Sequence, residues 1–180
     1  MNNSIFLHED FYRQIELIPK QNYFFVTKTI STIQEVERSD EGFVRCKIRP
    51  EHLIKMASLG IRFDDLKRVL EPLSLGYVEE IDSGYGRSSY RLENTVAWAF
   101  ERYGIFVDRH NDFVESIWIC KSSKFLFSNS ANLLSRALTL LANDFNLILV
   151  DWNREIVVDI SKPINLNLYL VTVLRFNLVE

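Results

Sequence analysis

Histidine and cysteine side chains are where catalytic or metal chemistry is easiest to recognise in a sequence, because they act as metal ligands, bases and nucleophiles. This 180-residue chain contains five of them: His8, His52, His110, Cys46 and Cys120. They form no HExxH or CxxC pattern, and no GxSxG motif is present. Cys46 and His52 could meet in space as a nucleophile and its base, but one sequence does not show their geometry. We therefore expect no metal ion, no cofactor and no catalytic residue.

Two short segments resemble motifs of proteins that bind phosphate groups or cleave nucleic acids. Gly84-Tyr85-Gly86 begins like the phosphate-binding GxGxxG motif, but Ser89 occupies the third glycine position and the flanking pattern is that of a hairpin. Asp65-Leu66-Lys67 has the spacing of a nuclease carboxylate and lysine, but it falls within a predicted helix. We interpret both segments as structural.

The charged residues are unevenly distributed along the chain. Lys and Arg number 21 against 24 Asp and Glu, a net charge of −3 that argues against bulk nucleic acid as a partner. Between residues 43 and 70, however, basic residues outnumber acidic ones. The basic residues there are Arg45, Lys47, Arg49, Lys55, Arg62, Lys67 and Arg68, and the acidic ones are Glu51, Asp64 and Asp65.

The next stretch reverses the sign with Glu71, Glu79, Glu80 and Asp82. One interpretation is solvation, in which Arg45, Lys47 and Arg49 lie on an exposed strand face opposite Glu35 and Glu37. The other is a binding face whose separated charges steer a partner of opposite pattern.

The first half of the chain predicts two hairpins with helices between them. Residues 23–36 are rich in aromatic and β-branched types and predict a strand, paired through the turn 39–42 with a strand over 43–49. A helix is expected over 51–59, stopped by Gly60, and a second from Phe63 to Pro72. Segments 77–81 and 88–92 predict the second hairpin, with the glycine-containing segment 82–87 at its tip.

The second half predicts further alternation of the two element types. Asn94 suits the N-cap of a helix through Tyr103, closed by Gly104. A strand is expected within 113–120 and an amphipathic helix from about Ser130. Strands over 147–150 and 155–160 flank a tight turn in which Asn153 tolerates a left-handed conformation. Alternating leucines predict a long final strand over 166–178, which could pair across a homodimer axis.

Together these elements predict an α+β fold with an antiparallel or mixed sheet built from hairpins and three to four packed helices. A single domain over 1–180, or two packed halves dividing near Gly104, is the simplest organisation. The N-terminal residues lack a secretory signal pattern, and no stretch has the length of a membrane span. With its two separated cysteines, the chain is expected to be a soluble cytoplasmic protein without membrane contact.

Residues 51–92 resemble a winged-helix unit: a helix, the turn at Gly60, a second helix, and a hairpin whose Gly-Tyr-Gly-Arg tip is similar to a wing. The resemblance implies that Lys67 and Arg68 approach the DNA major groove and Arg87 contacts phosphates, with Arg62 nearby. Pro72, which shortens the second helix, and the acids Asp64, Asp65, Glu79 and Glu80 depart from a DNA-binding pattern. Many winged-helix units bind proteins instead.

The leading hypothesis is a non-enzymatic protein-binding module. In its general character the chain resembles the immunity proteins of bacterial toxin systems, which implies an inhibitor that binds a toxin directly. The candidate partner-binding residues are Glu79, Glu80, Asp82 and Tyr85, because acids steer a cationic partner and an aromatic ring anchors it. The alternative is a winged-helix transcriptional regulator that binds DNA. A third possibility is a small enzyme whose site includes His52, His110 or Cys46.

Overall fold

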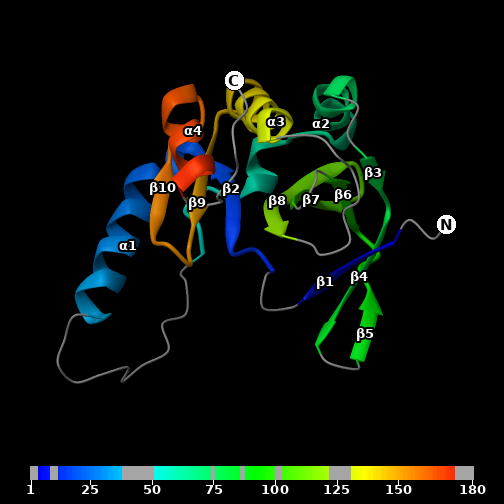
Figure 1. The fold of residues 1–180 in the computed structure, drawn as a ribbon, viewed down its shortest axis with the longest axis horizontal. Coiled ribbons are helices and arrows are strands. Elements are labelled where there is room, and N and C mark those ends of the chain that lie inside the picture. The colour runs from blue at the N-terminus through cyan, green and yellow to red at the C-terminus, as the bar shows by residue number, and fades with distance from the viewer. Residues whose placement is uncertain are drawn as a thin grey trace.

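The structure, a computed structural model, describes residues 4–8, 12–37, 51–73, 76–85, 88–99, 103–121 and 131–172. Over these ranges the chain forms four α-helices, a seven-stranded antiparallel sheet and a three-stranded mixed sheet (Figure 1). The predicted α+β class, with sheets built largely from hairpins, is therefore confirmed. No helix within these ranges has the length and apolar character needed to cross a bilayer.

The large sheet brings together strands from both halves of the chain. Its strand order is β10 (Ile156–Val158), β9 (Leu147–Asp151), β2 (Ile15–Pro19), β8 (Phe113–Lys121), β7 (Tyr103–His110), β6 (Thr95–Ala99) and β3 (Gly76–Val78). Strand β2, from the N-terminal part of the chain, lies between β8 and β9 and joins the two hairpins of the C-terminal half.

The small sheet consists of β1 (Ser4–His8), β4 (Glu80–Tyr85) and β5 (Ser88–Arg91). Strand β4 pairs in parallel with β1 and forms an antiparallel hairpin with β5. Figure 1 shows the free end of this hairpin extending away from the large sheet.

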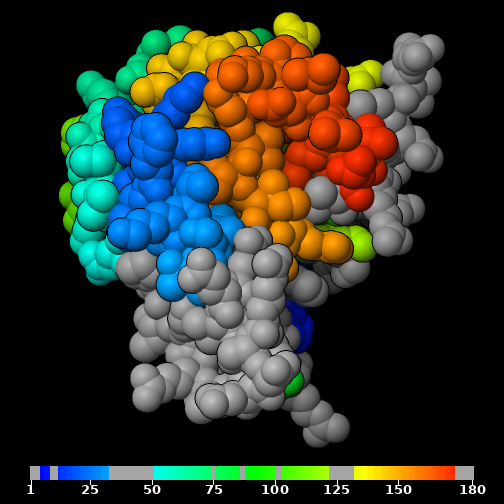
Figure 2. Space-filling view, turned by 90° about the vertical axis from the view of Figure 1, so that its left-hand side faces the viewer, coloured from blue at the N-terminus to red at the C-terminus, as the bar shows by residue number. Residues whose placement is uncertain are grey.

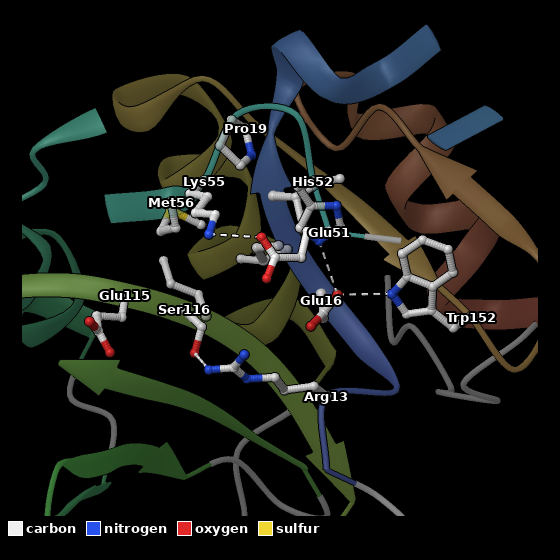
Figure 3. A pocket seen from close by; sticks show the side chains of 13 residues that line it. Arg13, Glu16, Pro19, Glu51, His52, Lys55, Met56, Glu115, Ser116 and Trp152 are labelled. Atoms are coloured by element: carbon white, nitrogen blue, oxygen red, sulfur yellow. Dashed lines mark hydrogen bonds and ion pairs between the residues drawn. The ribbon is translucent and has the colours of Figure 1, made fainter. Parts of the chain in front are cut away.

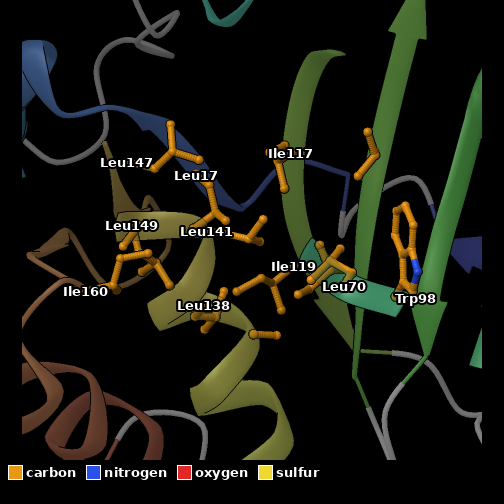
Figure 4. Packing of buried hydrophobic residues seen from close by; sticks show 14 of the residues in the cluster. Leu17, Leu70, Trp98, Ile117, Ile119, Leu138, Leu141, Leu147, Leu149 and Ile160 are labelled. Carbon is orange, nitrogen blue, oxygen red and sulfur yellow. The ribbon is translucent and has the colours of Figure 1, made fainter. Parts of the chain in front are cut away.

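One face of the large sheet is covered by α2 (Phe63–Leu70), α3 (Ala131–Phe145) and α4 (Pro163–Thr172). Leu138 and Leu141 of α3 pack on Leu17, Ile117 and Ile119 of the central strands (Figure 4). All five side chains are at most 1% exposed, so this layer supplies most of the buried apolar area that stabilises the fold.

The opposite face is covered by two separate elements. Val26 and Ile30 of α1 (Tyr23–Glu37) pack on β2 and β9, and the small sheet packs on β6, β7 and β8. At the β10 edge of the sheet, α1 and α4 lie on either side of β9 and β10, as Figure 2 shows with α1 in blue and α4 in orange-red. Two clusters of buried side chains therefore share this face, with polar residues between them.

Several predicted elements are confirmed. Helix α2 begins at Phe63 and ends before Pro72, helix α3 begins at Ala131, and β8 covers the strand predicted at 113–120. The hairpin predicted at 147–160 corresponds to β9 with β10, and the one predicted at 77–92 to β4 with β5. Its bounds differ, because Tyr77 and Val78 belong to β3 of the large sheet and residues 82–85 of the expected tip are part of β4. Within the turn between β9 and β10, the left-handed residue is Glu155, with φ of 56°, and Asn153 is not among the residues of positive φ.

The strand predicted over residues 23–36 is wrong, because this segment is helix α1. Its β-branched residues are compatible with the helix, because Val26 and Ile30, four residues apart, lie on the same helix face and are buried there. The hydroxyls of Thr27 and Thr29 donate to the carbonyls of Tyr23 and Phe25, one turn earlier. Tertiary burial has overridden residue preference here. The strand expected over 43–49 lies outside the described residues.

The long final strand is also wrong over residues 166–172, which belong to helix α4, while 173–178 lie outside the described residues. Leu166 and Leu170 are fully buried, whereas Leu168, of the same parity, is 64% exposed. A strand would bury all three, so the exposure of Leu168 reflects a period of four and not of two.

Three other predictions are corrected. The helix expected over 94–103 is replaced by strand β6, and Gly104 lies in β7 opposite Ala99. The helix expected over 51–59 is reduced to a 3-10 turn, Met56–Leu59. The winged-helix unit is not confirmed, since its first helix is that single turn and β4 pairs with β1 in a separate sheet.

Candidate functional site

The predicted acidic residues of the β4–β5 hairpin are brought together in part. The Arg91 guanidinium donates to Asp82 through Nε at 2.7 Å and lies 3.5 Å from Glu80, so it partly neutralises both carboxylates. Glu79, which precedes β4, accepts a hydrogen bond from the Tyr77 hydroxyl at 3.1 Å. The local charge is thus less negative than the sequence suggested.

The predicted anchor Tyr85 lies on the other face of the same hairpin. Side chains alternate along a strand, so Tyr85 and Ser83 point away from Asp82. Tyr90 is opposite Ser83 in the register and therefore shares the face of Tyr85. The two tyrosines are 61% and 54% exposed, and Tyr85 also makes an edge contact with the His8 ring.

Strand β5 is an open edge of the small sheet. All four of its residues are exposed, and within the described ranges β5 pairs only with β4. Gly84 allows the two strands to approach closely, since a Cβ there would lie 1.9 Å from the Ser88 carbonyl oxygen. In the part of the chain that the structure describes, the hairpin thus presents an open strand edge and two exposed aromatic rings.

The residues predicted for nucleic-acid binding are not brought into one basic surface by the described structure. Lys67 and Arg68 lie on α2 near acids of that helix and of the turn after it, at 3.5 Å from Glu71 and 3.1 Å from Asp65. Arg62 precedes α2 and forms an isolated bridge with Phe113. Arg87, like the basic residues Arg45, Lys47 and Arg49, lies outside the described residues.

A second candidate site, which the sequence did not predict, is a pocket of about 310 Å³ where two strands diverge (Figure 3). Strand β2 pairs with β8 through Leu17 but with β9 as far as Pro19, so β2 and β8 separate beyond Leu17. The segment 51–56 borders this gap. The pocket is lined by Arg13, Glu16, Leu17, Ile18, Pro19, Glu51, His52, Lys55, Met56, Glu115, Ser116, Ile117 and Trp152.

Glu16 is the central polar group of the pocket. Its Oε2 accepts a hydrogen bond from Trp152 Nε1 at 2.9 Å and lies 3.4 Å from His52 Nε2 (Figure 3). The His52 ring stacks on the indole of Trp152, with centroids 6.1 Å apart. The carboxylate is only 13% exposed, so two rings fix its orientation in a partly desolvated position.

A second polar network adjoins the pocket at Asp108. Its carboxylate accepts hydrogen bonds from Tyr12, Arg13, Thr95 and Ser116. Arg13 also donates to the Ser116 hydroxyl, and it reaches this position from a left-handed backbone conformation, with φ of 51°. Because the Ser116 hydroxyl donates to Asp108, it is not aligned as a nucleophile for His52.

The remaining reactive side chains that the sequence singled out are dispersed. Cys120 is buried beneath the small sheet, where desolvation raises the pKa of its thiol to about 12. His8 lies at the end of β1 and His110 at the end of β7, whereas Cys46 lies outside the described residues. Among the residues that the structure describes, no group of three or more His, Cys, Asp or Glu could hold a metal ion.

Sequence reasoning had named only His52 among the residues that meet at Glu16. Glu16 and Trp152 are 136 positions apart, and they meet because β2 and β9 are neighbours in the sheet. One signal was available: Glu16 interrupts the apolar run Ile15–Pro19, and a charge inside a buried strand needs a partner.

Comparisons of this chain with models of protein families, with curated proteins and with solved structures find no match.

Proposed function

We propose that the protein is a non-enzymatic binding module that contacts another protein through the β4–β5 hairpin. The observation that carries the proposal is the pair Tyr85 and Tyr90, more than half exposed on one face of a hairpin with an open strand edge. Large exposed aromatic groups on one face of a hairpin are typical of interaction sites, because burying them on binding costs little conformational entropy.

The open edge of β5 supplies the second part of the interaction. An extended segment of a partner can pair with the backbone of β5 and so add a strand to the small sheet. Main-chain hydrogen bonds would then provide affinity, and the two tyrosines would provide specificity by contacting side chains of the added strand.

The acids of the hairpin and of the residue just before it indicate the charge of the partner. Glu79, Glu80 and Asp82 exceed the one arginine that lies among them, so the hairpin attracts a basic surface during encounter. A basic toxin domain neutralised by direct binding is the partner class that the sequence analysis favours, and we keep it as a prediction.

The proposal is tested by quantitative affinity capture from the native cell. The wild-type chain and the double variant Tyr85→Ala/Tyr90→Ala are used as baits, and recovered proteins are compared by mass spectrometry. A specific partner is expected to fall at least about tenfold with the double variant. The matched control is Leu168→Ala, which removes an exposed apolar side chain from α4.

The control also provides the contrary outcome. If every specific partner is retained by the double variant, or is lost only with Leu168→Ala, the hairpin is not the binding site. Circular dichroism of each bait checks that the fold is preserved.

A further inference from the structure

We propose that the pocket between β2 and β8 binds an organic cation, namely an ammonium or guanidinium group carried on a short alkyl chain. This inference concerns a different site from the hairpin and does not rest on the proposed function. It is argued from the charges, the burial and the shape of the pocket.

The charges of the lining residues favour a cation. Three carboxylates line the pocket, Glu16, Glu51 and Glu115, against two permanent cations, Arg13 and Lys55, and the imidazole of His52, which is charged only when protonated. Both cations already have close acidic partners. Arg13 lies 2.6 Å from Asp108, which is outside the lining, and Lys55 lies 2.8 Å from Glu51. Among the residues that the structure describes, the carboxylates of the lining thus outnumber its permanent cations, which favours a cationic ligand.

The burial of Glu16 makes its charge effective. Water screens the charge of Glu16 little, since the Glu16 side chain is 13% exposed. The indole of Trp152 also holds one of the Glu16 oxygens in place. Glu115, on β8, is a second and more exposed acidic residue in the lining of the same pocket. A donor such as an ammonium group would gain charge-assisted hydrogen bonds to carboxylate oxygens of this lining.

The walls of the pocket explain the alkyl chain. Leu17, Pro19, Met56 and Ile117 line it together with the polar groups. Methylene groups pack on such apolar walls while the charged end remains with the carboxylates, as in lysine and arginine side chains at protein surfaces. A volume of about 310 Å³ is at the lower end for ligand pockets and suits one short chain.

The same chemistry has two sources: a free small amine, or a lysine or arginine side chain of a partner protein. The experiment titrates the full-length chain with four isosteres, n-butylammonium, n-butylguanidinium, 1-butanol and butyrate. Binding is followed by the indole N–H resonance of Trp152 in NMR spectra, assigned with Trp152→Phe. The two cations are expected to bind saturably, and at least about tenfold more tightly than the neutral and anionic compounds.

Variants locate the binding in the pocket. Glu16→Gln keeps an oxygen that accepts from Trp152 but removes the charge, and it is expected to weaken cation binding about tenfold. Glu115→Gln is expected to weaken it in the same direction, and this exposed position keeps the test valid if Glu16→Gln does not fold. The matched control is Glu93→Gln, an exposed acid in the turn between β5 and β6, which is expected to leave binding unchanged.

A peptide separates the two sources. The capped pentapeptide Gly-Gly-Lys-Gly-Gly is compared with n-butylammonium. If the peptide binds at least as tightly as n-butylammonium, the natural ligand is a side chain of a partner protein. If only the free amine binds, the natural ligand is a small molecule. Both outcomes support the cation site. The proposal is overturned if no cation binds, if butyrate or butanol binds as tightly, or if the folded Glu16→Gln and Glu115→Gln variants bind like the wild type.

Discussion

The side-chain amide of Asn22 makes two hydrogen bonds with the backbone of Ile54. Its nitrogen donates to the Ile54 carbonyl at 2.8 Å, and its oxygen accepts from the Ile54 N–H at 2.9 Å. Asn22 is fully buried in the 3-10 turn Lys20–Asn22, just before α1. This pair therefore attaches the segment that carries His52 to the end of β2 that carries Glu16, and it sets the geometry of the pocket.

Replacing this amide tests that attachment. In Asn22→Ala, the backbone N–H and carbonyl of Ile54 lose their partner, and the free energy of unfolding is expected to fall by about 1 to 3 kcal/mol. Urea denaturation measures the loss, and hydrogen exchange should show faster exchange of the Ile54 amide. Asn165→Ala, at an exposed position of α4, is the control. Unchanged exchange at Ile54 would contradict the anchoring role.

Burial of Cys120 predicts an unreactive thiol. Desolvation raises its pKa to about 12, so very little thiolate exists at pH 8. In a Cys46→Ser variant, which leaves a single thiol, a disulfide reagent at pH 8 is expected to label the native protein slowly. The same variant in denaturant should label at once. Rapid labelling without denaturant would place Cys120 at the surface.

The elements that the sequence predicted correctly are those whose pattern fits one period only. In α3, Leu134, Leu138 and Leu141 repeat at helical spacing, and no alternation competes with it. In α4, Leu166 and Leu170 satisfy both a period of two and a period of four, so the pattern alone does not decide. In β6 all five residues are buried between two layers, and the alternation that marks a half-exposed strand is lost.

The two candidate sites differ in how far apart their residues lie in the sequence. The β4–β5 hairpin is local in sequence, so its residues could be named before the structure was known, although not the faces they occupy. The pocket depends on β2 lying between β8 and β9, a topology that no single segment encodes. Glu16, His52 and Trp152 come from three distant segments, and only the sheet order makes them neighbours.

The buried pair Tyr169 and Asp151 holds α4 on β9. The Tyr169 hydroxyl donates to Asp151 Oδ2 at 2.9 Å, and both side chains are at most 3% exposed. Tyr169→Phe leaves that oxygen without this donor, and the free energy of unfolding is expected to fall by about 1 to 3 kcal/mol. Tyr23→Phe, at a more exposed position, should change it little. Equal effects of the two substitutions in urea denaturation would contradict the prediction.

Asp159 predicts a dependence of stability on pH. Partial burial alone would raise its pKa, but hydrogen bonds from Ser161 and Lys20 and the charge of Lys20 outweigh burial and hold the pKa below its usual range. A carboxyl group with a lowered pKa stabilises the fold above its unfolded pKa, and that contribution disappears as the pH falls through the folded value. Asp159→Asn is therefore expected to be less stable than wild type at pH 7, with a smaller difference at pH 3. Urea denaturation at the two pH values measures this, and an equal difference would show that the charge is not responsible.

Substitution of Gly84 should open the β4–β5 hairpin without unfolding the core of the large sheet. Because a Cβ at this position would lie 1.9 Å from the Ser88 carbonyl oxygen, a backbone atom that no rotamer change can move, Gly84→Ala must open the pairing of β4 with β5. The core contacts of Ile81 lie three residues earlier and are expected to persist. Amides of β5 should exchange faster, while those of β7 and β8 should keep their protection.

Ser89→Ala is the matched control, since it changes an exposed side chain of β5 without a backbone conflict. If the open edge of β5 binds a partner, Gly84→Ala abolishes capture of that partner and Ser89→Ala retains it. Global loss of protection in Gly84→Ala would mean that the hairpin and the core unfold together. Partner capture by a variant with an opened hairpin would remove strand addition at β5 as the mode of binding.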